Sequence, residues 1–133
     1  MSLRVGIDLV QVSRIAESLA EFGDRFLRRL YTDGEIAYAT AAPALTHARL
    51  AARFAAKEAA LKALGLGGEG VDWRQIEVRR ASSGACELAL HGATAQHARD
   101  LGIAELALSL SHEGDYATAV VVSTSNVPTS PTP

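Results

Sequence analysis

The alternation of apolar and polar residues near the N-terminus predicts a β-strand over residues 3–12. Val5, Ile7 and Leu9 share one face of this strand, and Asp8 falls on the other. Aspartate is normally depleted in strands, yet here it stands among apolar neighbours. The pattern therefore indicates a core strand that carries one conspicuous carboxylate.

Three short helices are predicted after this strand, over residues 14–22, 25–31 and 35–42. Ser13 is a favourable N-cap for the first helix, and Gly23 is a favourable residue to end it. The first third of the chain therefore consists of one predicted strand followed by helices.

The longest helical pattern covers residues 46–64, and the rest of the chain is organised around it. Alanine and leucine dominate this stretch, which contains no internal glycine or proline. The chain has two lysines, Lys57 and Lys62, and both lie here on either side of Glu58. Lys57 falls inside the apolar stripe, whereas Glu58 and Lys62 lie together on its flank. Charges at the edge of a buried face need partners, because burying an unpaired charge is costly. The apolar members of the stripe are Leu50, Phe54, Leu61 and Leu64.

A glycine-rich loop over residues 65–70 leads into a second half with strand periodicity. The predicted elements there are a hairpin of strands 73–80 and 85–90, a helix over 92–101, and a hairpin of strands 105–111 and 116–123. Residues 1–125 thus form one predicted α+β domain, in which a largely antiparallel sheet packs with one long helix and shorter helices. Residues 126–133, rich in proline, are predicted to be a disordered tail.

The composition is that of a folded protein rather than a disordered or membrane-spanning one. The 133 residues are 48% hydrophobic and 21% charged, which suits a single folded domain. A net charge of −2 gives no basic field for nucleic acid, and no uninterrupted apolar stretch of about 18 residues is present to span a membrane. Arg4 and Asp8 interrupt the first apolar run, so we expect no signal peptide. The single cysteine, Cys86, excludes an intramolecular disulfide and is compatible with the cytoplasm.

Asp8 and Glu58 are candidate ligands of a metal ion. Carboxylates from two separate elements suit a hard cation such as Mg2+, which completes its shell with phosphate oxygens and water. The alternative is that both carboxylates are neutralised within the protein, Asp8 by Lys57 and Glu58 by Lys62 at a spacing of one helical turn. The pattern alone favours this alternative, because it does not show that the strand and the helix touch.

Lys62 and a serine–histidine pair are candidate contacts of a phosphate. Lys62 follows Glu58 by one turn and precedes the glycine-rich loop, so it could contact a phosphate or accept a proton; a solvated lysine is the commoner alternative. Ser111 and His112 end a predicted strand, but strand spacing does not aim the histidine at the serine, and no third member of a catalytic triad is visible. A hydrogen bond to a phosphate is better supported there than nucleophilic catalysis, with a plain turn histidine as the alternative.

A local basic patch on the first two predicted helices is a candidate interface for an acidic protein partner. Arginines form a positive rim, and aromatic and aliphatic side chains between them can act as apolar anchors. The alternative is a solvated face that nearby acidic residues neutralise. The patch includes Arg14, Arg25, Phe26 and Arg29, and the acidic neighbours are Glu17, Glu21 and Asp24.

Four segments, over residues 6–10, 23–35, 53–59 and 109–113, together resemble the holo-acyl-carrier-protein synthases. These are small 4'-phosphopantetheinyl transferases of fatty-acid synthesis, and the resemblance extends from about residue 5 to residue 122. It implies transfer of the 4'-phosphopantetheine group of coenzyme A to a serine of apo acyl carrier protein, with release of adenosine 3',5'-bisphosphate. It also implies a need for Mg2+, and a homotrimer whose active sites lie between subunits.

The resemblance assigns roles to individual residues. Asp8 and Glu58 would hold Mg2+ against the pyrophosphate, and Lys62 would contact phosphate. The nucleotide and the 3'-phosphate of coenzyme A would lie near Arg53, Ser111 and His112, with Gly65 beside them. The acidic recognition helix of the carrier protein would meet Arg14, Arg25, Phe26 and Arg29.

Two positions differ from the family pattern, and several alternatives stay open. Ala107 replaces a frequent histidine, and Leu66 replaces a frequent threonine in a glycine loop that looks shortened. The general base could be Glu35, Lys62 or a metal-bound water. Two alternatives to a transferase are a non-catalytic module that binds coenzyme A or a nucleotide, and a purely structural interaction domain.

Overall fold

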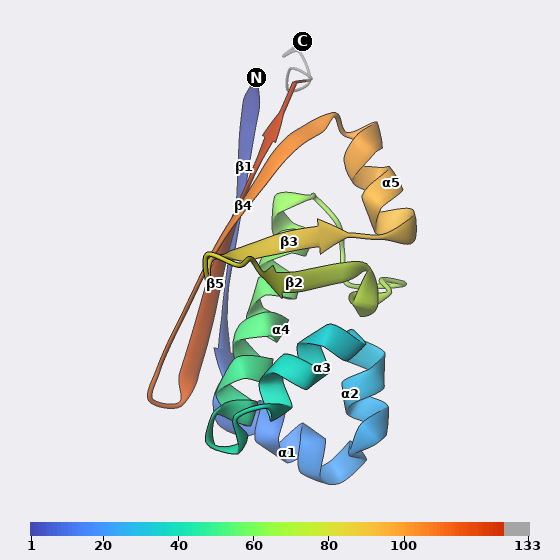
Figure 1. Ribbon diagram of the computed structural model, residues 1–133. Coiled ribbons are helices and arrows are strands. Elements are labelled where there is room, and N and C mark those ends of the chain that lie inside the picture. The colour runs from blue at the N-terminus through green and yellow to red at the C-terminus, as the bar shows by residue number, and fades with distance from the viewer. Residues whose placement is uncertain (127–133) are drawn as a thin grey trace.

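Two antiparallel sheets and five α-helices form the part of the chain that this computed structural model describes, residues 1–126 (Figure 1). The predicted α+β class is confirmed, and the predicted tail lies outside the described residues apart from Asn126. No helix in the described region is long and apolar enough to cross a membrane. In chain order the elements are β1 (Ser2–Gln11), α1 (Val12–Phe22), α2 (Asp24–Leu30), α3 (Asp33–Thr40), the 3-10 turn η1 (Pro43–Leu45), α4 (Thr46–Ala63), the 3-10 turn η2 (Trp73–Gln75), β2 (Ile76–Arg80), β3 (Cys86–Leu90), α5 (Gly92–Asp100), β4 (Ile103–Glu113) and β5 (Tyr116–Ser125).

β5 is the central strand of a three-stranded sheet, with β1 and β4 antiparallel on either side of it. The register places Asp8 opposite Ala119, and it places Leu9, Thr118 and Ser111 side by side in the next row. Because successive residues of a strand point to opposite faces, Asp8 and Ser111 lie on opposite faces of this sheet. β2 and β3 form a separate two-stranded sheet.

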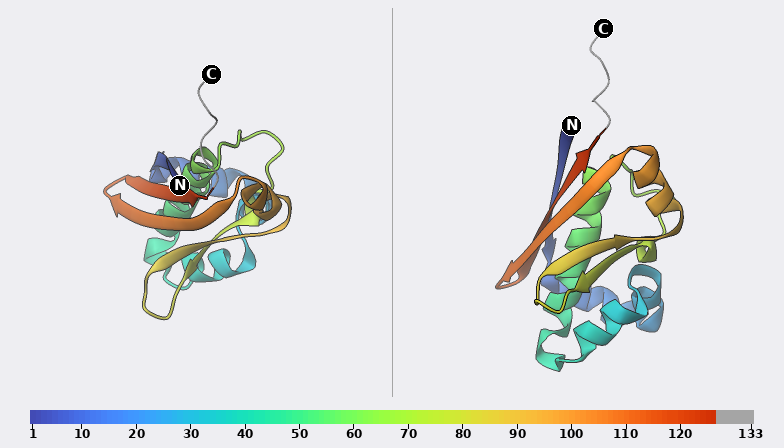
Figure 2. Two further views of the ribbon diagram at one scale, coloured as in Figure 1. Left: turned by 90° about the horizontal axis from the view of Figure 1, so that it is seen from above. Right: turned by 45° about the horizontal axis from the view of Figure 1, so that its top comes forward.

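α4 is the central helix, and it lies between the three-stranded sheet and the β2–β3 pair (Figure 2). Most of its side chains are buried, and many are alanines, so strand and helix backbones approach closely. One such close approach is at Gly6, where an added Cβ would lie 2.0 Å from the carbonyl oxygen of Ala59. Only glycine fits there without a shift of the backbone, and this contact brings Asp8 against α4.

The apolar face of β1 points outward, contrary to the expectation of a core strand. Leu3, Val5, Ile7 and Leu9 are between 62% and 69% exposed. The opposite face, which carries Asp8, packs on α4. The three-stranded sheet therefore presents an apolar outer surface that no other part of the described chain covers.

Two predicted boundaries differ because polar side chains make hydrogen bonds that the sequence pattern does not reveal. The strand predicted from residue 73 begins at Ile76, because the Asp72 side chain accepts a hydrogen bond from the backbone N–H of Arg74 (3.1 Å) and shapes η2. The first helix begins one residue before Ser13, which does not cap it. Instead, Ser13 donates from its hydroxyl (2.6 Å) and its backbone N–H (2.9 Å) to the carboxylate of Asp115.

Candidate active site

Asp8, Glu58 and Lys62 meet where β1 packs against α4. The Nζ atom of Lys62 lies 3.5 Å from Oδ1 of Asp8 and donates to the carbonyl of Ile7 at 2.8 Å. Glu58 lies one turn before Lys62 on the same side of α4. The Lys62 side chain is 54% exposed and that of Asp8 is 22% exposed. The three residues that the sequence predicted as metal or phosphate ligands therefore lie together at one solvent-accessible site.

The charge of Asp8 disfavours the ionised form of Glu58. Burial raises the pKa of Glu58, the nearby charge of Asp8 raises it further, and Lys62 lowers it. A hard cation would remove this repulsion, and carboxylate oxygens are the ligands that Mg2+ prefers in proteins. Among the described residues, no group of three or more His, Cys, Asp or Glu could hold a metal. A cation bound to this pair would therefore complete its shell with water and substrate oxygens, as Mg2+ commonly does.

Lys57 lies away from the site formed by Asp8, Glu58 and Lys62. The predicted ion pair between Lys57 and Asp8 is therefore wrong. The Nζ atom of Lys57 lies 2.8 Å from Oε1 of Glu35, and both side chains are fully buried. Nζ also donates to the carbonyl oxygens of Trp73 (3.0 Å) and Ile76. Asp8 is instead the partner of Lys62, and Lys57 holds α3, α4 and β2 together.

Glu35 is fully engaged within the core. In addition to the Lys57 ion pair, its carboxylate accepts the backbone N–H groups of Thr32 (2.8 Å) and Val78 (2.9 Å). With Thr32 it also forms a capping box at the start of α3. A carboxylate that is 1% exposed and bonded in this way is not placed to take a proton from an incoming hydroxyl, which removes Glu35 as a candidate base.

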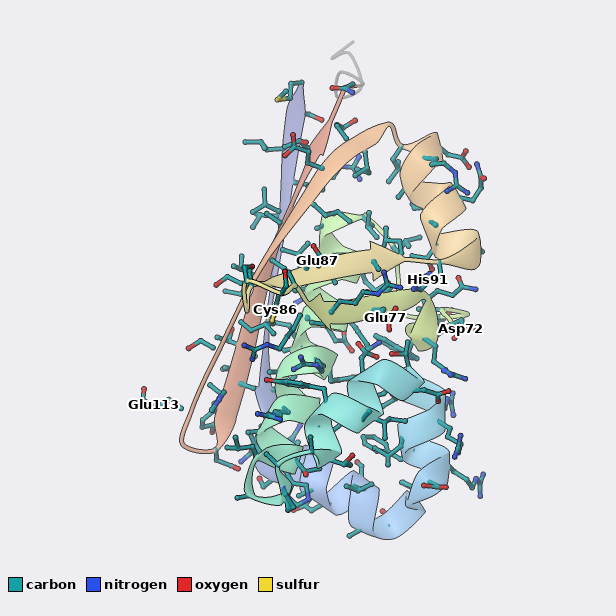
Figure 3. The ribbon with its side chains drawn as sticks, viewed as in Figure 1. Asp72, Glu77, Cys86, Glu87, His91 and Glu113 are labelled. Atoms are coloured by element: carbon teal, nitrogen blue, oxygen red, sulfur yellow. The ribbon has the colours of Figure 1, made fainter. Side chains whose placement is uncertain are left out.

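Ser111 and His112 lie at the far end of β4, on a different surface from Asp8. Together with Leu9 and Thr118 they line a hollow of about 410 Å3 near the β4–β5 turn. The neighbouring Glu113 stands at the tip of this hairpin, apart from the helices (Figure 3). Within one chain the structure does not bring this pair together with the acidic residues on the inner face of the sheet.

Gly65 and Arg53 differ in their distance from the acidic pair, which consists of Asp8 and Glu58. Gly65 follows the last turn, and its N–H donates to the carbonyl of Lys62 at 3.2 Å. Its φ of +69° favours glycine, and an added Cβ would lie 2.8 Å from Nη1 of Arg4. Arg53 is buried and precedes Glu58 by five residues, so it points about 140° away around the helix. Only Gly65 therefore adjoins the acidic residues in the same chain.

The predicted basic patch borders an apolar groove of about 460 Å3 between α2, α4 and η2. Arg25, Phe26 and Arg29 line it, whereas Arg14 is exposed on α1 and is not among the lining residues. The rings of Phe54 and Trp73, 5.4 Å apart, form another wall. The structure thus combines positive charge with an apolar floor, one helical turn from Glu58.

Sequence reasoning missed several residues around these places. It placed Phe54 on the apolar stripe of the long helix but gave it no role in the groove, and it gave Trp73 none. Tyr38, Arg49 and Arg80 gather on the other side of α4 beside Arg53. No periodic signal could have joined them, because they come from three different elements.

Comparison with known proteins identifies the family of the chain. The model of the 4'-phosphopantetheinyl transferase superfamily matches residues 4–121. The chain is 50% identical over 123 residues to a holo-[acyl-carrier-protein] synthase of Koribacter versatilis, covering 92% of this chain and 98% of that protein. For the synthase of Solibacter usitatus the identity is 44% with the same coverage.

Solved structures agree in fold. An ACPS–CoA complex of Chronobacterium ammoniagenes superposes with a TM-score of 0.87 at 33% identity, covering 96% of this chain and all of that one. A Helicobacter pylori holo-[acyl-carrier-protein] synthase in complex with coenzyme A gives 0.79 at 30% identity, covering 90% and 99%. A family match over most of the chain, with relatives of similar length, leads to one conclusion: the chain belongs to the 4'-phosphopantetheinyl transferase superfamily.

Proposed function

We propose that this protein transfers the 4'-phosphopantetheine group of coenzyme A to a serine of an apo acyl carrier protein and releases adenosine 3',5'-bisphosphate. The observation that carries the proposal is the meeting of Asp8, Glu58 and Lys62 at one accessible place in a chain of this superfamily. The names of the relatives and the coenzyme A complexes of the structural neighbours support these two substrates.

The reaction depends on neutralising the negative charge of the phosphates more than on an enzyme nucleophile. The serine oxygen of the carrier bonds to the phosphorus that bears pantetheine. The bond from that phosphorus to the 5'-phosphate oxygen of the nucleotide breaks, and the hydroxyl proton passes to water. Asp8 and Glu58 would hold Mg2+, which supplies positive charge against the pyrophosphate. The ammonium group of Lys62 donates to a phosphate oxygen beside them and stabilises the charge that grows there.

The carrier protein docks on the groove between α2, α4 and η2. Arg25 and Arg29 meet acidic side chains of the carrier, and Phe26, Phe54 and Trp73 receive apolar ones. Phe54 and Glu58 are one turn apart on α4, so a carrier seated there presents its serine close to the acidic pair. Arg14 extends the positive surface along α1.

A homotrimer with active sites between subunits is part of this proposal. The outer face of the three-stranded sheet, with Val5 and Ile7, is an apolar surface of the kind that subunit contacts cover. Ser111, His112 and Arg53 lie away from the acidic pair within one chain, so in the trimer they serve the nucleotide bound by a neighbouring subunit. The proposed location is a reducing cytoplasm, with which the free thiol of Cys86 is compatible.

Mass spectrometry of the carrier tests the activity. Incubation with coenzyme A, Mg2+ and an apo carrier protein should add the mass of one phosphopantetheine group to the carrier and none to a carrier whose acceptor serine is alanine. Absence of this mass, while an active synthase modifies the same carrier, would overturn the proposal. Binding of coenzyme A without transfer to any carrier would favour the non-catalytic module instead.

Sedimentation tests the assembly. Wild-type protein should sediment as a trimer, and Ile7→Glu should shift it to a monomer, because a charge on the apolar sheet face opposes its burial. A wild-type protein that stays monomeric at the concentration of the activity assay would contradict the shared site.

A further inference from the structure

The buried ammonium group of Lys57 is tied to the two residues that bracket η2. Its Nζ atom donates to the carbonyl of Trp73 at 3.0 Å and to the carbonyl of Ile76. Its third partner is Oε1 of Glu35 at 2.8 Å. An ammonium group has three donors, so this one is fully used. The turn η2 is therefore held against α4 by charged hydrogen bonds, which are stronger than bonds between neutral groups.

Trp73 extends this anchoring to the surface of the protein. Its ring centroid lies 5.4 Å from that of Phe54, and the two rings form one wall of the groove between α2, α4 and η2. Phe54 precedes Lys57 by three residues, so one turn of α4 contacts both the backbone and the ring of Trp73. The other end of η2 is tied elsewhere, because the Gln75 carbonyl accepts the backbone N–H of His91, labelled in Figure 3, at 2.8 Å. The position of the Trp73 wall therefore depends on α4.

The opposite wall of the groove is positioned by the same ammonium group. Phe26 lines the groove from α2, and its ring meets the Tyr31 ring edge to face, with 6.0 Å between the centroids. Tyr31 is fully buried, and its ring centroid lies 5.8 Å from Nζ of Lys57, within the range of cation–π attraction. Its hydroxyl donates to the carbonyl of Leu50 on α4 at 2.9 Å. Phe26 and Trp73 are thus both placed relative to one buried charge.

We propose that Lys57, neutralised by Glu35, is a positioning residue for the acyl carrier protein, because it sets the distance between Phe26 and Trp73 and thereby the fit of an apolar side chain of the carrier. The inference rests on the proposed function and on docking at this groove. Lys62 follows Lys57 by five residues and points about 140° away around the helix. Loss of the buried charge should therefore change the KM for the carrier, and neither kcat nor the KM for coenzyme A.

The double variant Glu35→Gln with Lys57→Met removes both charges at nearly constant volume. Its KM for the carrier should rise about 10-fold, the size expected for a displaced apolar anchor, while kcat and the KM for coenzyme A stay within about 2-fold. Tyr31→Phe is the control, because it removes a buried hydrogen bond and keeps both aromatic rings and the Lys57 bonds; its KM for the carrier should not change. An unchanged KM for the carrier in the double variant, or equal rises for both substrates, would overturn the inference.

Trp73→Leu decides whether Lys57 acts through the tryptophan. This variant alone should raise the KM for the carrier about 10-fold. Adding the double variant should raise it further by less than about 2-fold, because residues that act through one contact are not additive. Two effects that multiply would show that the buried pair acts elsewhere and would contradict the inference. Lys57→Met alone gives the same comparison if the double variant does not fold, because Glu35 can then neutralise itself by binding a proton.

Trp73 is the single tryptophan of the chain, so its fluorescence reports the position of the turn. The double variant should emit at longer wavelength than the wild type, because its ring gains contact with water, and Tyr31→Phe should emit as the wild type does. Identical emission from the double variant and the wild type would contradict the inference.

The same signal separates the inference from the proposed function. A wild type that transfers no phosphopantetheine would overturn the proposed function, and titration with the apo carrier, followed by Trp73 emission, would then decide the role of Lys57. Weaker binding by the double variant than by the wild type would support the positioning role. Equal affinity, or a wild type that does not bind the carrier, would overturn it.

Discussion

The two lysines of the chain lie five residues apart on α4, and their surroundings differ completely. Lys57 and Glu35 form a fully buried pair at 2.8 Å, closed on all sides by backbone hydrogen bonds. Lys62 and Asp8 are 3.5 Å apart and reach solvent. The first pair has no capacity left for a ligand, whereas the second keeps donors and acceptors free for one.

This difference separates what holds the protein together from what can act on a substrate. A buried pair resists separation because either partner alone would be an unpaired charge in the core. An exposed pair contributes little to folding and can exchange partners at small cost. We therefore expect the same residue types on one helix to serve stability on one side and the proposed chemistry on the other. Variants of each pair test this division.

The largest effect is expected from Glu35→Gln, which leaves Lys57 buried without a countercharge. The free energy of unfolding should fall by about 3–5 kcal/mol, as measured by urea denaturation at pH 7. The double variant Glu35→Gln with Lys57→Met should recover much of the loss, because no charge then remains unpaired. If the single variant lowers the free energy of unfolding by less than about 1 kcal/mol, the buried pair contributes no more to stability than the exposed pair.

Asp8→Asn should have the opposite profile, with a large effect on transfer and a small one on folding. Loss of one of two metal ligands should slow phosphopantetheine transfer at least about 100-fold, or roughly 3 kcal/mol of transition-state stabilisation. Unfolding should change by less than about 0.5 kcal/mol. Transfer assays at several Mg2+ concentrations measure the first effect. Near-normal rates in both Asp8→Asn and Glu58→Gln would rule out the acidic pair as the metal site.

A smaller effect is expected at the groove, where an exposed charge serves a partner rather than the reaction. Arg25→Glu should raise the KM for the carrier protein about 10-fold, which corresponds to roughly 1.4 kcal/mol, with an unchanged KM for coenzyme A. Arg99→Glu, outside the groove, is the matched charge reversal. Equal changes of both KM values in Arg25→Glu would argue against docking at this surface.

The smallest effect concerns the pH dependence of stability at Glu58. Its raised pKa means that the folded state binds a proton more tightly than the unfolded state, so the ionised form destabilises the fold at neutral pH. Glu58→Gln should therefore be more stable than the wild type at pH 7, by less than about 0.5 kcal/mol after allowance for solvent screening. The difference should vanish below the ordinary pKa of 4.5. A wild type that is more stable than Glu58→Gln at pH 7 without metal would contradict this sign.

Much of the fold and the acidic pair could be predicted because local patterns encode them. The uninterrupted alanine and leucine pattern of residues 46–64 predicts α4, and a carboxylate in a strand is conspicuous wherever it occurs. The charge pattern suggested Asp8 and Glu58 as one metal site, and the resemblance then favoured that site over ion pairs within the protein. The position of Lys57 inside an apolar stripe predicted that it is buried. Its partner Glu35 could not be predicted, because it lies on a different helix.

The missed features all depend on which surfaces meet in three dimensions. The outward direction of Val5 and Ile7 could not be read from alternation, because alternation defines two faces and not which of them is covered. The cluster of Tyr38, Arg49 and Arg80 joins three elements whose sequences show nothing unusual. Glu35 was a candidate base beside Lys62 and a metal-bound water, and its burial together with its ion pair to Lys57 excludes it.

In the proposed metal site, the contact of Gly6 with Ala59 would influence ion selectivity. Mg2+ requires ligand oxygens at about 2.0–2.1 Å, whereas Ca2+ accepts about 2.3–2.6 Å in a looser shell. One proposed ligand is on β1 and the other on α4, so the spacing of these two backbones sets the span between the carboxylates. The missing methyl group of Gly6 keeps that spacing small. The size of the cation that this protein accepts would then be set by a residue that never touches it.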